Sequence, residues 1–112
     1  MEIRDTIELS VKRPDSFRAI QEGLKLGEVR LYRGFITSIN SGDAVSIVCG
    51  KEEVWVRVSR IDIYDTIDEM LIHKNNSGIL GKNNIKKEYY QEFYKKEDLD
   101  RYQVAVIMFN IL

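Results

Sequence analysis

The chain has 112 residues, of which 44% are hydrophobic and 31% charged, and its formal net charge is −1. This length and balance fit one globular domain spanning residues 1–112, and they argue against a disordered or fibrous chain. The near-zero net charge excludes a polycation that coats nucleic acid, although it does not exclude a local basic groove.

The sequence contains one cysteine, Cys49, and one histidine, His73. An internal disulfide is therefore excluded, a zinc site would need carboxylates, and we expect no metal and no cofactor. No apolar run approaches the roughly 20 residues that cross a bilayer. Residues 1–13 lack the apolar core of a secretory signal, so we expect a cytoplasmic protein that does not contact membranes.

Strand and helix signals follow one another at the start of the chain. Residues 6–12 alternate between polar and apolar, which predicts a strand. Pro14 fits the first turn of a helix, and Gly23 fits its end. The apolar stripe of this helix consists of Phe17, Ile20 and Leu24.

Three more strands are predicted before residue 64. The first, over residues 28–33, places Val29 and Leu31 on one face and Glu28 and Arg30 on the other. After a loop over residues 34–42, the strands 44–49 and 53–63 are joined by a hairpin turn at Gly50.

The second half of the chain changes to helical signals. Thr66 begins a capping box and a helix, and residues 75–84 form a loop rich in glycine and asparagine. A helix over residues 85–96 and a turn or short helix over 98–101 precede a final strand, 102–112, which is apolar on both faces and so predicted to be buried. The role of the 75–84 loop stays open.

These elements predict an α+β fold, a small curved sheet or β-barrel of five to six strands decorated by about three helices. A flat α/β sheet would need a helix after every strand, whereas residues 44–63 form a hairpin.

The densest group of polar residues occupies residues 23–30. Lys25 lies in the turn after the first helix, and Glu28 and Arg30 share one face of the next strand. One interpretation is an exposed ion pair that contributes at most about 1 kcal/mol. The other is a pocket in which a carboxylate orients a lysine or arginine toward an anionic or base-like ligand.

The run Gly23, Lys25, Glu28 and Arg30 matches the G-x-K-x-x-E-x-R signature of the ASCH domain family, which are small PUA-like β-barrels. The chain resembles this family over nearly its whole length: at the Gly42-Asp43 pair, at the strand that ends in Tyr64 and at the segment 93–111. The resemblance implies a cleft between barrel and helices that binds RNA or a nucleotide, lined by Lys25, Glu28 and Arg30.

Further ligand-binding candidates surround this run. Arg33 belongs to the arginine-rich first half of the chain, and guanidinium groups suit phosphate. Lys82 lies in the acid-free segment 70–87, which we expect to form a basic rim. Tyr90 and Tyr94 suit stacking on bases, although ordinary helix packing is the favoured interpretation for both.

Two alternatives to simple binding stay open. Some relatives are N4-acetylcytidine amidohydrolases that resemble this chain at Lys25 but have threonine in place of Glu28, and that use a glutamate where this chain has 75–77 (Asn-Asn-Ser). The threonine nucleophile therefore does not carry over, whereas a ribonuclease with Lys25 and Glu28 as acid and base remains a candidate. A protein-interaction module would use an apolar loop tip at Ile79 and Leu80.

Overall fold

A computed structural model describes residues 7–112 and shows a five-stranded sheet in the order β1-β3-β4-β5-β2. β1 pairs with β3 in parallel, and the other neighbours are antiparallel. The strands are β1 (Ile7–Ser10), β2 (Gly27–Leu31), β3 (Ala44–Cys49), β4 (Glu52–Tyr64) and β5 (Val104–Ile111).

The sheet curls until its two edge strands approach each other. The Arg30 guanidinium of β2 donates from Nη2 to the carbonyl oxygen of Ser10, the last residue of β1, over 2.7 Å. One side chain thus bridges the opening between β1 and β2, which we call the seam. The architecture is a curled half-barrel, in agreement with the predicted curved sheet.

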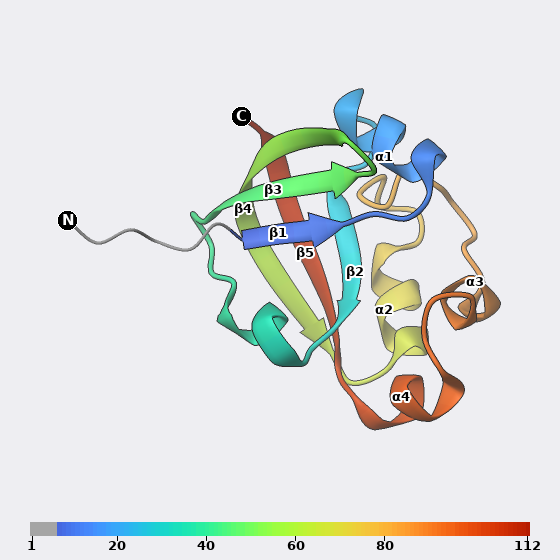
Figure 1. Cartoon of the computed structure of the whole chain (residues 1–112). Helices are drawn as coiled ribbons and strands as arrows, with labels where there is room; N and C mark the ends of the chain where they lie inside the picture. Colours follow the sequence, from blue (N-terminus) through green and yellow to red (C-terminus); the bar gives the residue numbers. More distant parts are fainter. Residues whose placement is uncertain (1–6) are drawn as a thin grey trace.

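Four α-helices gather on one side of the sheet, as Figure 1 shows, and a 3-10 helix, η1, follows β2 on the other side. The helices are α1 (Pro14–Gln21), α2 (Ile67–Lys74), α3 (Lys87–Gln91), α4 (Lys96–Arg101) and η1 (Gly34–Ser38).

The final strand, β5, is shared between two hydrophobic cores. Ala105, Ile107 and Phe109 face the core inside the curled sheet, and Val104, Val106 and Met108 face the core beneath the helices. Successive side chains of a strand point to opposite faces, so a strand between two cores is apolar on both. The prediction of a buried last strand is confirmed.

Local signals also placed several turns and one helix start correctly. Thr66 Oγ1 accepts a hydrogen bond from the Glu69 N–H over 3.1 Å, which is the predicted cap of α2. Gly50 has φ of +61° in the hairpin between β3 and β4, and Gly23 has φ of +74° just after α1. Glycine adopts this left-handed conformation without steric cost.

Three predicted segments need correction. Leu24 is 63% exposed, because α1 ends at Gln21 and the turn at Gly23 carries Leu24 off the apolar stripe. The predicted loop 34–42 contains η1. The predicted helix 85–96 is much shorter: the Tyr90 carbonyl accepts from both Phe93 and Tyr94 N–H groups, which tightens the chain and ends α3 at Gln91.

The apolar tip predicted at Ile79 and Leu80 is not exposed. Leu80 is 4% exposed and belongs to the core beneath the helices, and Ile79 packs against the same core. The side chain of Asn75 accepts from Ile85 N–H (2.8 Å) and donates to its carbonyl (3.0 Å), which ties the ends of the 75–84 loop together. The closed loop folds back onto β2, where the Ile79 carbonyl accepts from Leu26 N–H.

Candidate functional site

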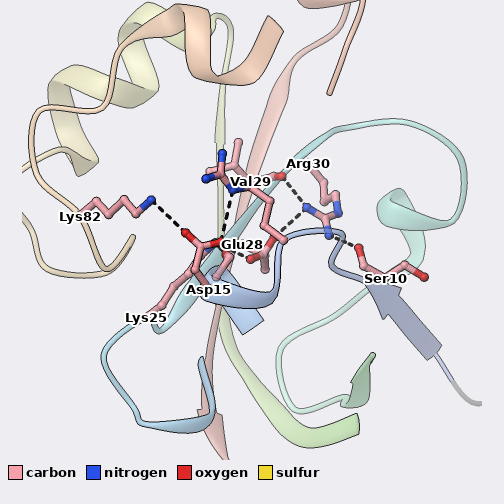
Figure 2. Close-up of polar contacts among 9 residues, drawn as sticks. Ser10, Asp15, Lys25, Glu28, Val29, Arg30 and Lys82 are labelled. Carbon is pink, nitrogen blue, oxygen red and sulfur yellow. Dashed lines mark hydrogen bonds and ion pairs between the residues drawn. The ribbon is translucent and has the colours of Figure 1, made fainter. Parts of the chain in front are cut away.

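The turn between α1 and β2 places three charged side chains side by side. Lys25 N–H is anchored on the Ala19 carbonyl at the end of α1, and Glu28 and Arg30 follow on β2. Lys25 Nζ lies 2.6 Å from Glu28 Oε1, and Arg30 Nη1 lies 2.7 Å from Glu28 Oε2 (Figure 2). The predicted run therefore converges on one carboxylate.

This cluster is removed from solvent. The side chains of Glu28, Lys25 and Arg30 are 5%, 14% and 21% exposed. The interpretation as an exposed ion pair is therefore wrong. A charged group taken out of water needs partners, and Glu28 has two cations.

Part of the hydrogen-bonding capacity of the two cations is unused within the described chain. An ammonium carries three N–H donors and a guanidinium five. Lys25 donates to Ser16 Oγ and contacts Glu28, and Arg30 donates to Glu28, to the Val29 carbonyl and to the Ser10 carbonyl. At least one donor on Lys25 and two on Arg30 remain for a ligand.

The Glu28 carboxylate has little hydrogen-bonding capacity left for a ligand. Glu28 Oε2 accepts from Arg30. Glu28 Oε1 is buried and has no partner with hydrogen-bond geometry among residues 7–112, although the Lys25 ammonium lies beside it. The carboxylate is therefore turned to its own cations, and it holds them in place.

The three charged groups line a cavity of about 190 Å³, which we call the Lys25 pocket. Its opposite wall is aromatic and comes from α3 and the turn after it. The residues of the pocket are Ser10, Val11, Lys12, Arg13, Ser16, Lys25, Glu28, Val29, Arg30, Tyr89, Tyr90, Phe93 and Tyr94.

Contacts between neighbouring rings hold the aromatic wall in place. The Tyr89 ring meets the Tyr90 and Phe93 rings edge-on, with centroids 5.1 and 5.4 Å apart. Burial raises the pKa of Tyr89 and of Tyr90, so both phenols are neutral at pH 7 and add no negative charge to the pocket.

The other predicted site residues fall into two groups. Tyr90 and Tyr94 line the Lys25 pocket, and Tyr90, only 5% exposed, is also part of the core. Arg33 and Lys82 lie outside it, in hollows to either side. Lys82 Nζ lies 3.5 Å from Asp15 Oδ2 and 5.7 Å from the centre of the Tyr89 ring, at the mouth of the pocket.

The basic rim predicted over residues 70–87 is only partly present. Lys74 is 8% exposed and points inward to Asp62, with Nζ 2.8 Å from Oδ2. Lys87 lies 3.7 Å from Asp68, at the far end of this segment. Of the segment's lysines, Lys82 alone lines one of the hollows described here.

Several pocket residues were not predicted. Ser16 offered a signal, since it is a small polar residue on the buried face of α1, between Arg13 and Phe17. Tyr89 and Phe93 were not predicted either, although the predicted helix placed Tyr90 and Tyr94 beside them. Ser10 contributes through its carbonyl and carried no sequence signal.

Within residues 7–112, no group of three His, Cys, Asp or Glu side chains is placed to hold a metal ion. In the same part of the chain, every helix is too short or too polar to cross a membrane.

No family model matches the sequence, and no curated protein matches it either. Solved structures do. The hypothetical protein PH0355 superposes with a TM-score of 0.79 at 25% identity, over 96% of this chain and 100% of its own. Protein PF0455 from Pyrococcus furiosus gives 0.71 at 27% identity, over 96% and 98%.

A mutant of the protein ZmASCH from Zymomonas mobilis superposes with a TM-score of 0.65 at 11% identity, over 92% of this chain and 66% of that protein. This likeness defines the fold. The chain has an ASCH-type, PUA-like fold, in which a five-stranded curled sheet carries four helices. The resemblance seen in the sequence is thus confirmed at the level of the fold.

Proposed function

We propose that the Lys25 pocket binds one nucleotide unit, either of RNA or of a free nucleotide. The phosphate contacts the free donors of Lys25 and Arg30, and the base lies against the aromatic wall. Charge-assisted hydrogen bonds from ammonium and guanidinium groups to phosphate are strong, and bases stack on aromatic side chains.

The observation that carries this proposal is the set of unused N–H donors on two partly buried cations that line a cavity. One carboxylate, Glu28, faces the cations of Lys25 and Arg30. Lys12 and Arg13 also line the pocket, and of these Arg13 is paired with Asp15 and Glu92. The excess of positive charge favours an anion. The aromatic wall makes a flat, apolar group attached to that anion a better fit than a bare anion.

The test is isothermal titration calorimetry with cytidine 5′-monophosphate and with cytidine, which lacks the phosphate. We expect the monophosphate to bind at least tenfold more tightly, and Lys25→Met to remove this advantage. Lys74→Met is the matched control, because Lys74 is also a partly buried, ion-paired lysine but lines none of the described hollows. Equal affinity for both compounds, or unchanged binding in Lys25→Met, would contradict the proposal.

Hydrolysis in the same pocket is the second candidate, and one contact favours it. Lys25 Nζ lies 2.6 Å from Ser16 Oγ, and a hydroxyl beside a lysine can act as a nucleophile when the lysine accepts its proton. We rank hydrolysis second because Lys25 Nζ donates to Ser16 Oγ in this structure, whereas a base would have to accept a hydrogen bond from it.

Turnover of N4-acetylcytidine, or cleavage of a single-stranded RNA, tests the second candidate. Product formation that disappears in Ser16→Ala and in Glu28→Gln would make hydrolysis the leading function. A wild-type protein that binds either compound and releases no product would contradict it.

A further inference from the structure

A second and larger hollow adjoins the Lys25 pocket along the seam. This seam groove has a volume of about 500 Å³ and shares Ser10, Arg30 and Tyr94 with the pocket. Its other walls are the edge of β1, the end of β2 and the start of η1, namely Glu8, Leu9, Leu31, Arg33, Gly34, Phe35 and Ile36. The two hollows meet at the hydrogen-bonded pair Arg30 and Ser10, so a ligand that occupies both contacts this bridge between the edge strands.

The seam groove carries the same pair of chemical features as the pocket. Arg33 supplies a cation whose side chain is 42% exposed and is held from behind by Asp98 (3.4 Å) and by the Tyr102 ring (5.0 Å). Phe35 supplies an aromatic ring and is 57% exposed. Single exposed apolar residues are common on protein surfaces, and Phe35 stands out among them because it lines this groove together with Arg33.

A third, smaller hollow adjoins the pocket on the opposite side. It has a volume of about 40 Å³ and shares Ser16, Lys25, Val29 and Tyr89 with the pocket. Lys82 lines it and lies over the Tyr89 ring. The three hollows thus adjoin one another through shared residues, and we call this series the path. Each of the three is lined by at least one cation and at least one aromatic ring.

We propose that this path binds an extended single strand of nucleic acid, with one nucleotide in the Lys25 pocket, the next in the seam groove, and the phosphate on the other side of the pocket against Lys82. The inference rests on the proposed function and extends it from one nucleotide to a strand. Proteins that bind single strands combine a positive groove along the backbone with rings on which the bases stack. A base can enter a cavity as small as the Lys25 pocket only when it is unpaired.

Phe35 and Arg33 are the residues that separate this proposal from the pocket alone. Phe35 stacks on the base that follows the one in the pocket, and Arg33 contacts the phosphate between them. Neither residue lines the Lys25 pocket, so neither affects a mononucleotide.

The test is fluorescence anisotropy with labelled oligomers of cytidylate, in ribose and deoxyribose forms, from one to six nucleotides long, and with a duplex of the longest one. We expect at least a tenfold gain in affinity from the monomer to the tetramer and no comparable binding of the duplex. Phe35→Ala weakens tetramer binding about tenfold and leaves the monomer unchanged. Arg33→Ala lowers the slope of log affinity against log salt by about one.

Two exposed residues outside all three hollows provide matched controls. Trp55→Ala removes an exposed ring from β4, and Arg60→Ala removes an exposed guanidinium from the same strand. Both variants retain tetramer affinity if the path is the binding surface. A preference for the ribose or the deoxyribose series identifies the natural strand as RNA or DNA.

The outcomes distinguish the two proposals. Monomer binding that depends on Lys25, without a gain from length or an effect of Phe35→Ala, overturns the extended path and keeps the pocket. Tetramer binding that depends on Phe35 and Arg33 but not on Lys25 overturns the proposed nucleotide site in the Lys25 pocket. It also overturns the path, because the path includes this pocket. Absence of binding by any oligomer overturns both.

Discussion

Residues 7–112 contain two ionic clusters of the same composition, and of these the Glu28 cluster lines the Lys25 pocket, whereas the Asp62 cluster lines none of the three hollows described above. Glu28 is held by Lys25 and Arg30 at the Lys25 pocket, and Asp62 is held by Lys74 and Arg60 between β4 and α2. Each is one carboxylate between one lysine and one arginine. The chemistry of a charge cluster alone therefore does not identify a binding site.

What differs is where the unused hydrogen-bonding capacity lies. At the Asp62 cluster, Arg60 is 68% exposed, so its remaining donors face water, and Lys74 is 10% exposed and lies against the sulfur of Met108. At the Glu28 cluster, both cations line a cavity with an aromatic wall. The first cluster fastens α2 to the sheet, and the second is the one at which we propose ligand binding.

The largest expected effect is on stability and comes from Asp62→Asn. This change leaves the ammonium of Lys74 nearly buried without a counter-charge, which we expect to lower the free energy of unfolding by about 3 kcal/mol. Urea denaturation measures the loss, and calorimetry with cytidine 5′-monophosphate checks that affinity is retained. A variant that is fully stable and no longer binds would reverse the roles of the two clusters.

The second largest expected effect is a loss of stability in acid, and it comes from the Asp62 cluster. Hydrogen bonds from Arg60 and Lys74 lower the pKa of Asp62 from 3.8 to about 2. A lowered pKa stabilises the fold at pH values above 3.8, and this contribution disappears as the pH falls toward 2. It amounts to about 2 kcal/mol. Denaturation curves between pH 5 and 2 should show the loss in the wild type, and a smaller loss in Asp62→Asn; parallel curves would contradict the assignment.

The smallest expected effect is on stability and comes from Gly27→Ala, at the contact between β2 and the 75–84 loop. A Cβ at Gly27 would lie 2.5 Å from Ile79 Cγ2, so Gly27→Ala should displace the 75–84 loop and cost about 1.5 kcal/mol. The double variant Gly27→Ala with Ile79→Ala should lose less stability than the sum of the losses in the two single variants, because the clash is absent from it. Simple additivity in thermal or urea unfolding would mean that the loop does not rest on β2 in solution.

The sequence was sufficient where a structural feature depends on neighbours in the chain. Period-two alternation located the strands, and the run from Gly23 to Arg30 predicted a charge cluster because its members lie within one turn and one strand. The alternation of Val54, Val56 and Val58 was also correct up to the irregularity at Val58 and Arg60, where an extra residue shifts the register with β5.

The sequence was insufficient where distant segments meet. The Ser10 carbonyl and the Ser16 hydroxyl become partners of Arg30 and Lys25 only after the sheet has curled and α1 has packed. The aromatic wall required the early end of α3, which no helix-breaking residue signals. Lys74 was expected at the surface because its partner, Asp62, is on another element.

One consequence of the strand order concerns how the protein acquires its binding capacity. β2, which carries Glu28 and Arg30, is an edge strand and joins the sheet only through β5, the strand that comes last in the chain. Contacts between segments so far apart in sequence form slowly during folding. Before residues 104–111 have been synthesised, β1, β3 and β4 can pair with one another. β2, which carries Glu28 and Arg30, then has no neighbouring strand. The ligand binding that we propose should therefore require the whole sheet, and it should be the last native property to appear on refolding.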